Sequence, residues 1–206
     1  MAVDIDGVNS TISTDKLIPQ SGTALQIGES SDVITIPSGA TITNSGTANG
    51  FGGGKVLQVV SAVLTSTFSS SSATFVDSGL NVSITPSATS SKILVLVQTN
   101  GSSASGGGTY VNLVRGSTDI LLGDAATGMI QCSGGSENAG SEYENIHFAL
   151  TYLDSPSIPA TPVAINYKTQ VRSRNTNAFY VNRQQTESSG RAARIPSTIT
   201  CIEIGA

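Results

Sequence analysis

Short apolar runs with a period of two, separated by turn residues, recur along this chain and constrain its fold more than any other feature. Residues 92–97 read Lys-Ile-Leu-Val-Leu-Val, and residues 198–204 read Thr-Ile-Thr-Cys-Ile-Glu-Ile. Such alternation places successive side chains on opposite faces of a β-strand. No stretch of the sequence sustains the helical period of 3.6 residues. The chain is therefore expected to be all-β.

From residue 55 onward the expected strands are long and are separated by Gly, Pro, Ser and Asp turn signals. Many short strands with such turns predict an antiparallel β sandwich, most simply of the jelly-roll type. The segment 92–97 is apolar on both faces, so its strand should be central or covered by a neighbouring subunit. The predicted strands are residues 56–68, 74–76, 80–85, 92–99, 109–115, 119–122, 129–132, 146–153, 163–172, 179–182 and 198–204.

Residues 1–54 follow a different pattern and predict an extended N-terminal arm. Short Thr/Ile alternations such as Val33-Ile-Thr-Ile36 lie between turn residues, and a Gly-rich joint follows at 50–54. Strands of about four residues cannot bury a core within one chain. Around a threefold axis, however, Ile34, Ile36 and Ile42 could meet their copies, which predicts a homotrimer. The domain prediction is an arm at 1–54, serving as anchor, and a sandwich at 55–206.

The composition excludes several classes of protein. Charged residues make up 12% of the chain and the net charge is −4, which argues against a general nucleic-acid binder. No apolar run reaches membrane-spanning length, and the first residues do not resemble a signal peptide. The two cysteines, Cys132 and Cys201, are too few for a disulfide scaffold, and free thiols are expected ahead of a disulfide.

The sequence offers little equipment for catalysis. His147 is the single histidine, and it lies inside a predicted strand. Cys132 is its only candidate partner as a nucleophile, and no nucleophile elbow is present. One histidine with two separated cysteines does not match a zinc site, and Gly52-Gly-Gly-Lys55 lacks the spacing of a phosphate-binding loop. We therefore expect no enzyme activity, no metal and no cofactor.

Charge is distributed unevenly along the second half of the chain. Six acids and no Lys or Arg lie between residues 119 and 154, whereas six Lys and Arg residues and one acid lie between 168 and 194. The two regions could be separate solvated surfaces, or they could meet within one sandwich or across a subunit boundary. A third alternative is that the basic region binds an anionic cell-surface sugar. The residues of this candidate charged interface are Arg172, Arg174, Arg183, Glu142 and Glu144.

Several phrases of the sequence together resemble a known family. They are residues 55–61, 74–86, 90–97, 113–119, 152–156 and 197–204, preceded by 34–46. As a set they are similar to a β domain found in tail-fibre and other virion proteins of marine and freshwater phages. The resemblance covers roughly residues 24–206. It implies a location on the virion surface, no enzyme activity and trimerisation, and it assigns no binding residues.

Two structural roles agree with this resemblance. In the first, the chain is a tail-fibre or spike-like appendage that docks through its arm and presents the sandwich to the host. In the second, it is a capsid decoration protein that cements the phage head. The expected partners are copies of the chain itself, other virion proteins and a host cell-surface glycan, with neither nucleic acid nor membrane among them.

Overall fold

The computed structural model describes residues 56–104, 106–137, 141–188 and 190–205, together with Val33, Thr35, Ser38 and Gly39. The chain divides into two compact units, Met1–Asn49 and Gly50–Ala206. The strands of the described residues belong to the second unit: β1 (Val56–Leu64), β2 (Phe68–Ser70), β3 (Val76–Ile84), β4 (Lys92–Ser103), β5 (Thr109–Arg115), β6 (Thr118–Ile120), β7 (Gly134–Ser136), β8 (Ile146–Asp154), β9 (Ile165–Ser173), β10 (Phe179–Val181) and β11 (Ser197–Ile204).

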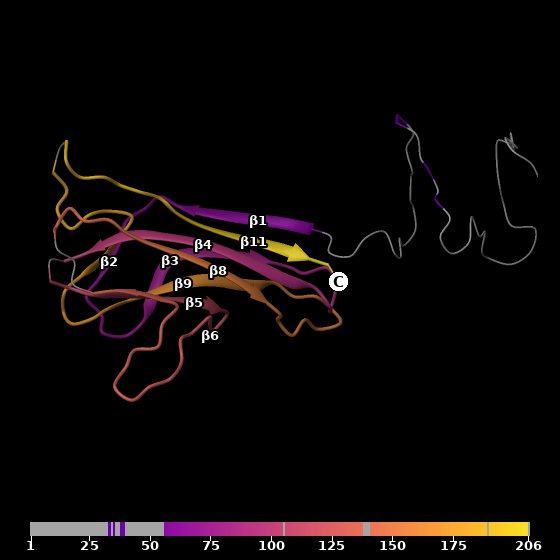
Figure 1. The fold of residues 1–206 in the computed structure, drawn as a ribbon, viewed down its shortest axis with the longest axis horizontal. Coiled ribbons are helices and arrows are strands. Elements are labelled where there is room, and N and C mark those ends of the chain that lie inside the picture. The colour runs from indigo at the N-terminus through magenta and orange to yellow at the C-terminus, as the bar shows by residue number, and fades with distance from the viewer. Residues whose placement is uncertain are drawn as a thin grey trace, which may run out of the picture. The chain divides into compact units, whose positions relative to one another are not determined.

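The strands form two antiparallel sheets packed face to face, which confirms the predicted sandwich (Figure 1). Sheet A contains β1, β2, β4, β8, β10 and β11, and sheet B contains β3, β5, β6, β7 and β9. The described residues contain no helix, so they contain none that could cross a membrane.

The order of the strands identifies the sandwich as a jelly roll. In sheet A, β11 and β10 pair with successive parts of β4, and β1 and β2 pair with β11 and β10 in turn. The six strands therefore occupy four positions, with β8 on the other side of β4. In sheet B, β6 and β7 share one edge of β5. Numbering the eight positions along the chain gives the orders 1-8-3-6 and 2-7-4-5, which are those of a double Greek key.

The core lies between the two sheets and is built from alternate residues of each strand. Ile93, Val95 and Val97 of β4 are at most 5% exposed, and they face fully buried Val111 and Leu113 of β5. β4 is central in its sheet, between β11 and β8, as its two apolar faces predicted. Burying side chains of this size stabilises the fold by roughly 1.5–3 kcal/mol each.

Three local predictions are wrong for identifiable reasons. The predicted strands 74–76 and 80–85 are not separated by a turn: Gly79 adopts a φ of +92° in a bulge, and β3 continues through it. Residues 100–103 do not belong to a loop but extend β4, where Gly101 allows the backbone of β10 to approach. Residues 129–132 do not form a strand, and they lie in the long loop between β6 and β7.

Candidate binding surfaces

The outer face of sheet A carries an uncharged surface that crosses four of its strands. Three consecutive rows cross β1, β11, β4 and β8 without one charged residue. We call these residues the charge-free face. The rows are Val59, Ile202, Leu94 and Leu153; Ser61, Thr200, Leu96 and Thr151; and Val63, Thr198, Gln98 and Ala149.

Large apolar side chains are exposed on this face. Val59 and Val63 are 56% and 60% exposed, and Leu153 is 50% exposed. A shallow hollow of about 340 Å³ lies over the middle row, with Leu96 beside small side chains of β8 and β11. A surface that exposes several large apolar side chains and is depleted of charge is typical of a protein–protein contact.

The outer face of sheet B has the opposite character. Its β3 and β9 strands present Asp77, Asn81, Asn166, Lys168 and Gln170 to the outside. No large exposed apolar residue belongs to a sheet B strand in the described part of the chain. The sandwich therefore has one face with a large uncharged area and one polar face.

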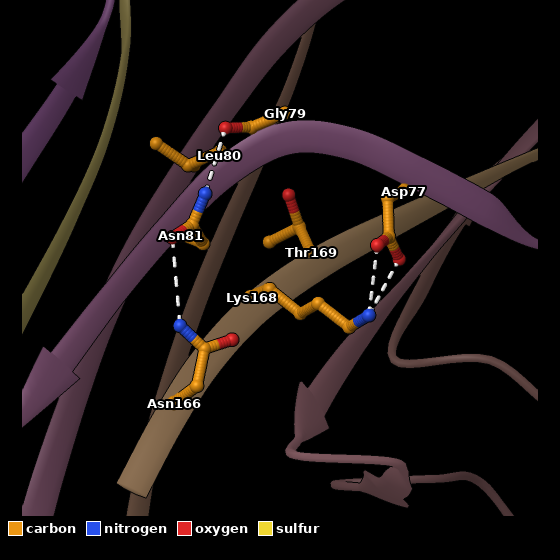
Figure 2. Close-up of a pocket in the computed structure, with 7 residues that line it drawn as sticks. All are labelled: Asp77, Gly79, Leu80, Asn81, Asn166, Lys168 and Thr169. Carbon is orange, nitrogen blue, oxygen red and sulfur yellow. Dashed lines mark hydrogen bonds and ion pairs between the residues drawn. The ribbon is translucent and has the colours of Figure 1, made fainter. Parts of the chain in front are cut away.

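A polar hollow of about 190 Å³ opens on this second face beside the bulge in β3 (Figure 2). The register of β3 against β9 shifts between Asp77 and Asn81, so Ser78, Gly79 and Leu80 lie opposite Thr169 alone. Ser78 turns inward, and its Oγ lies 2.6 Å from Oγ1 of Thr169. The bulge thus separates the outward side chains and creates the hollow.

Hydrogen bonds order the walls of the hollow. Nζ of Lys168 lies 2.8 Å from the Asp77 carboxylate, and Nε2 of Gln170 donates to the same group at 2.8 Å. The hydrogen bond from Lys168 is the main reason that the pKa of Asp77 is lowered, so this carboxyl is ionised at neutral pH. On the other wall, Nδ2 of Asn166 donates to Oδ1 of Asn81 at 3.4 Å.

A buried carboxylate holds one end of the sandwich together. Glu203 of β11 is fully buried, and its oxygens accept hydrogen bonds from Gln58, from Ser91 and from both the backbone and the hydroxyl of Ser87, at 2.6–2.8 Å. Burial opposes ionisation, but the hydrogen bonds from Ser91, Gln58 and Ser87 outweigh it and lower the pKa of Glu203 to about 2. Because its oxygens are occupied by these donors, we assign Glu203 a structural role.

A second buried acid, Asp154, links the two sheets. Its carboxylate accepts hydrogen bonds from Nη1 of Arg115 at 2.7 and 2.8 Å and from the hydroxyl of Tyr167 at 2.6 Å. Asp154 belongs to sheet A, whereas both donors belong to sheet B. Burial and the Asp154 carboxylate raise the pKa of Tyr167, which therefore remains a hydrogen-bond donor.

The single histidine has a simple environment. His147 lies on the outer side of β8, and its Nδ1 is 2.6 Å from Oδ1 of Asn100. Cys132 belongs to the loop before β7, and Cys201 is buried in the core; both thiols are free. In the residues that the structure describes, no group of three or more His, Cys, Asp and Glu side chains could hold a metal ion.

An ion pair between described residues joins the acidic and the basic stretch. Nη1 of Arg174 lies 2.5 Å from Glu137, an acid that the predicted interface did not include. Arg183 instead stacks 4.3 Å from the ring centroid of Tyr180 and lies 3.7 Å from Glu187 of its own stretch.

Other residues of the candidate charged interface make different contacts or are exposed. Glu142 accepts a hydrogen bond from Thr186 at 2.8 Å. Arg172 lies 6.0 Å from the ring centroid of Phe75, and Glu144 is exposed before β8. The candidate trimer contacts Ile34, Ile36 and Ile42 lie outside the described residues.

Sequence reasoning did not find the polar hollow. The polar residues at alternate positions of 166–170 and of 81–83 are the only local signal of this face. However, Asp77 and Lys168 are 91 positions apart in the sequence, and the bulge in β3 sets the register that brings them together. That register is not visible in a single sequence.

Comparison with known proteins adds no assignment to these surfaces. No protein-family model matches the chain, and no curated protein matches it.

Proposed function

We propose that this chain is a non-enzymatic structural protein of a bacteriophage particle, a homotrimeric tail-fibre or spike-like appendage at the virion surface. In this proposal the N-terminal arm docks onto other virion proteins, and the sandwich faces the host. The resemblance of residues 24–206 to phage virion β domains motivates the location.

The observation that best supports assembly into a homotrimer is the charge-free face of sheet A. Val59 and Leu153 are exposed in the single chain, and Ile202 and Leu94 between them are half-buried, although side chains of this kind gain roughly 1.5–3 kcal/mol each when fully buried. A copy of the chain offers the same uncharged surface, so the contact buries no unpaired charge. Around a threefold axis the charge-free faces of three copies would converge on the axis, so that each is covered by its two neighbours.

The positions of the chain ends and of the loops support the proposed orientation of the sandwich, with the arm at one end and the host at the other. Val56 pairs with Ile204, so the sandwich is entered and left at the same end. The loops that follow β4, β7, β9 and β10 lie at the opposite end, as the pairing of these strands requires. Loops at one end of a rigid sandwich are a common place for recognition.

Electron microscopy of phage particles labelled with an antibody against the sandwich tests the location. Label on the tail supports the appendage. Label spread over the head instead supports the alternative, a capsid decoration protein that cements the shell, and absence of label from intact particles overturns both roles.

Deleting residues 1–46 tests the docking role of the arm. We expect a folded sandwich that no longer enters particles. Normal incorporation of the shortened chain would show that the anchor lies in the sandwich.

A further inference from the structure

The polar hollow between β3 and β9 has no role in the core or in the proposed assembly. It lies on the outer face of sheet B, and the charge-free face lies on the outer face of sheet A, so contact through sheet A leaves the hollow open. Each subunit of an assembly would present one such hollow to solvent.

The charges of the hollow balance. Asp77 contributes one negative charge and Lys168 one positive charge, and their side chains are in contact at 2.8 Å. An anionic ligand would meet the Asp77 carboxylate, and a cationic ligand would meet the Lys168 ammonium. The pair therefore favours a neutral ligand that can both donate and accept hydrogen bonds.

The lining also retains unused hydrogen-bonding capacity. Among the described residues, none donates a hydrogen bond to Oδ1 of Asn166, because the contacts of its side chain all run through Nδ2. The ammonium of Lys168 has three donors, and Asp77 is its hydrogen-bond acceptor. On the rim of the hollow, β9 thus offers an acceptor at Asn166 and, two residues on, a donor at Lys168.

We propose that this hollow binds a neutral hexose of a cell-surface glycan, with Asp77 and Asn166 accepting hydrogen bonds from sugar hydroxyls and Lys168 donating to a sugar oxygen. Adjacent sugar hydroxyls both donate and accept, which matches this acceptor and donor. A volume of about 190 Å³ suits one ring of a small polar ligand rather than an extended chain.

The absence of an aromatic wall sets the expected strength of binding. The residues around the hollow are polar apart from Leu80 and Gly79, so no ring stacks on the sugar. A single site should therefore be weak, with a dissociation constant on the order of millimolar. Three linked sites on one particle appendage would raise the overall avidity without any new contact. The biological role of this binding rests on the proposed function in host attachment, whereas the binding itself does not.

Saturation-transfer difference NMR on the full-length protein tests the inference. The probes are methyl α-glucoside, methyl α-mannoside and methyl β-galactoside, each at about 10 mM, with glucuronic acid and N-acetylneuraminic acid as anionic counterparts. We expect transfer to at least one neutral sugar and weaker transfer to both acids. No transfer to any neutral sugar, or a preference for the acids, overturns the proposal.

Paired variants locate the site. Asn166→Ala and Lys168→Met should each weaken binding of the responsive sugar by about tenfold, whereas Asn175→Ala on an exposed loop and Lys92→Met on sheet A should leave it unchanged. Thermal unfolding of each variant verifies the fold. Equal binding by the Asn166→Ala variant and the original chain would place the sugar elsewhere and overturn the proposal.

The outcomes separate this inference from the proposed function. If the sugar binds at the hollow but antibody does not label particles, the virion role fails and the sugar site stands. If particles are labelled but no neutral sugar binds, the sugar site alone fails.

Discussion

Glu203 and Asp154 lie in the same row of sheet A, one on each side of Ile93, and both carboxylates are buried at one end of the sandwich. The charge of each carboxylate is stabilised in a different way. Glu203 is surrounded by hydroxyl, amide and backbone donors, whereas Asp154 is paired with Arg115 and Tyr167. Two buried charges in one row make this end of the fold sensitive to the loss of either set of partners.

Replacing Glu203 by Gln should lower the free energy of unfolding by about 2 kcal/mol, because the amide cannot accept all four hydrogen bonds. Urea denaturation at a fixed protomer concentration measures this change. Asp119→Asn, at an exposed position in β6, is the matched control and should change stability by less than about 0.5 kcal/mol. Equal stability of the two variants would contradict the structural role of Glu203.

The same residue predicts a dependence of stability on pH. The pKa of Glu203 is about 2 in the folded protein against an ordinary value of 4.5. Its contribution, about 3 kcal/mol, is therefore fully present above pH 4.5 and is lost as the pH falls through 2. Denaturation curves collected across this window should show the loss in the original chain and a flatter profile in the Glu203→Gln variant. Parallel profiles of stability against pH for the two proteins would contradict this role of the Glu203 carboxylate.

Leu96→Glu should convert the proposed trimer into monomers, because it introduces an unpaired charge at the centre of the charge-free face. Leu122→Glu is a matched control, since both leucines are 38% exposed but Leu122 lies on the loop after β6. Light scattering coupled to size-exclusion chromatography gives the mass of each. A monomeric original chain, or a trimeric Leu96→Glu variant, would refute assembly through this face.

Gly101→Ala should be strongly destabilising, because a Cβ there would overlap the backbone carbonyl oxygen of Tyr180 in β10. Gly79→Ala provides the comparison: the nearest atoms are Leu64 methyl groups at 3.6 Å, so only its φ of +92° is unfavourable. We expect a cost of about 1 kcal/mol for Gly79→Ala and several times more for Gly101→Ala. Thermal melting compares them, and similar melting temperatures would show that β10 can move away.

The two thiols should differ in reactivity. Burial raises the pKa of Cys201 to about 12 and also raises the pKa of Cys132, which is partly exposed. Because the thiolate is the reactive form, a thiol reagent at pH 8 should label Cys132 slowly and Cys201 only after unfolding. Mass spectrometry counts the labels. A folded Cys132→Ser variant should take up none, and labelling of that variant would show that the core opens.

The sandwich was predictable because its signals are local. Period-two runs such as 92–97 and 109–115 specify a strand through their own side chains, and the two apolar faces of 92–97 correctly indicated a central position. Boundaries failed where long-range contacts decide them. Gly101 favours a loop by propensity, yet pairing with β8 and β10 keeps it in a strand.

The candidate surfaces were less accessible to sequence reasoning. Which residues share a face of a sheet follows from alternation, but which strands are neighbours does not. The rows of the charge-free face join Val59, Leu94 and Leu153, which are brought together only by the jelly-roll order. Likewise, Glu203 in an alternating run looked like any strand acid, since its donors come from the distant segments 58 and 87–91.

The pairing of β1 with β11 determines how the sandwich responds to mechanical load. The sandwich begins at Val56, and from there to Leu64 the backbone of β1 pairs with that of β11. A pull on the arm directed away from the sandwich, with the loops at the far end held, strains these hydrogen bonds together instead of one after another. Because such a load acts in shear, the hydrogen bonds between β1 and β11 share the force, and β1 resists separation from the sandwich more strongly than it would if the bonds broke one at a time.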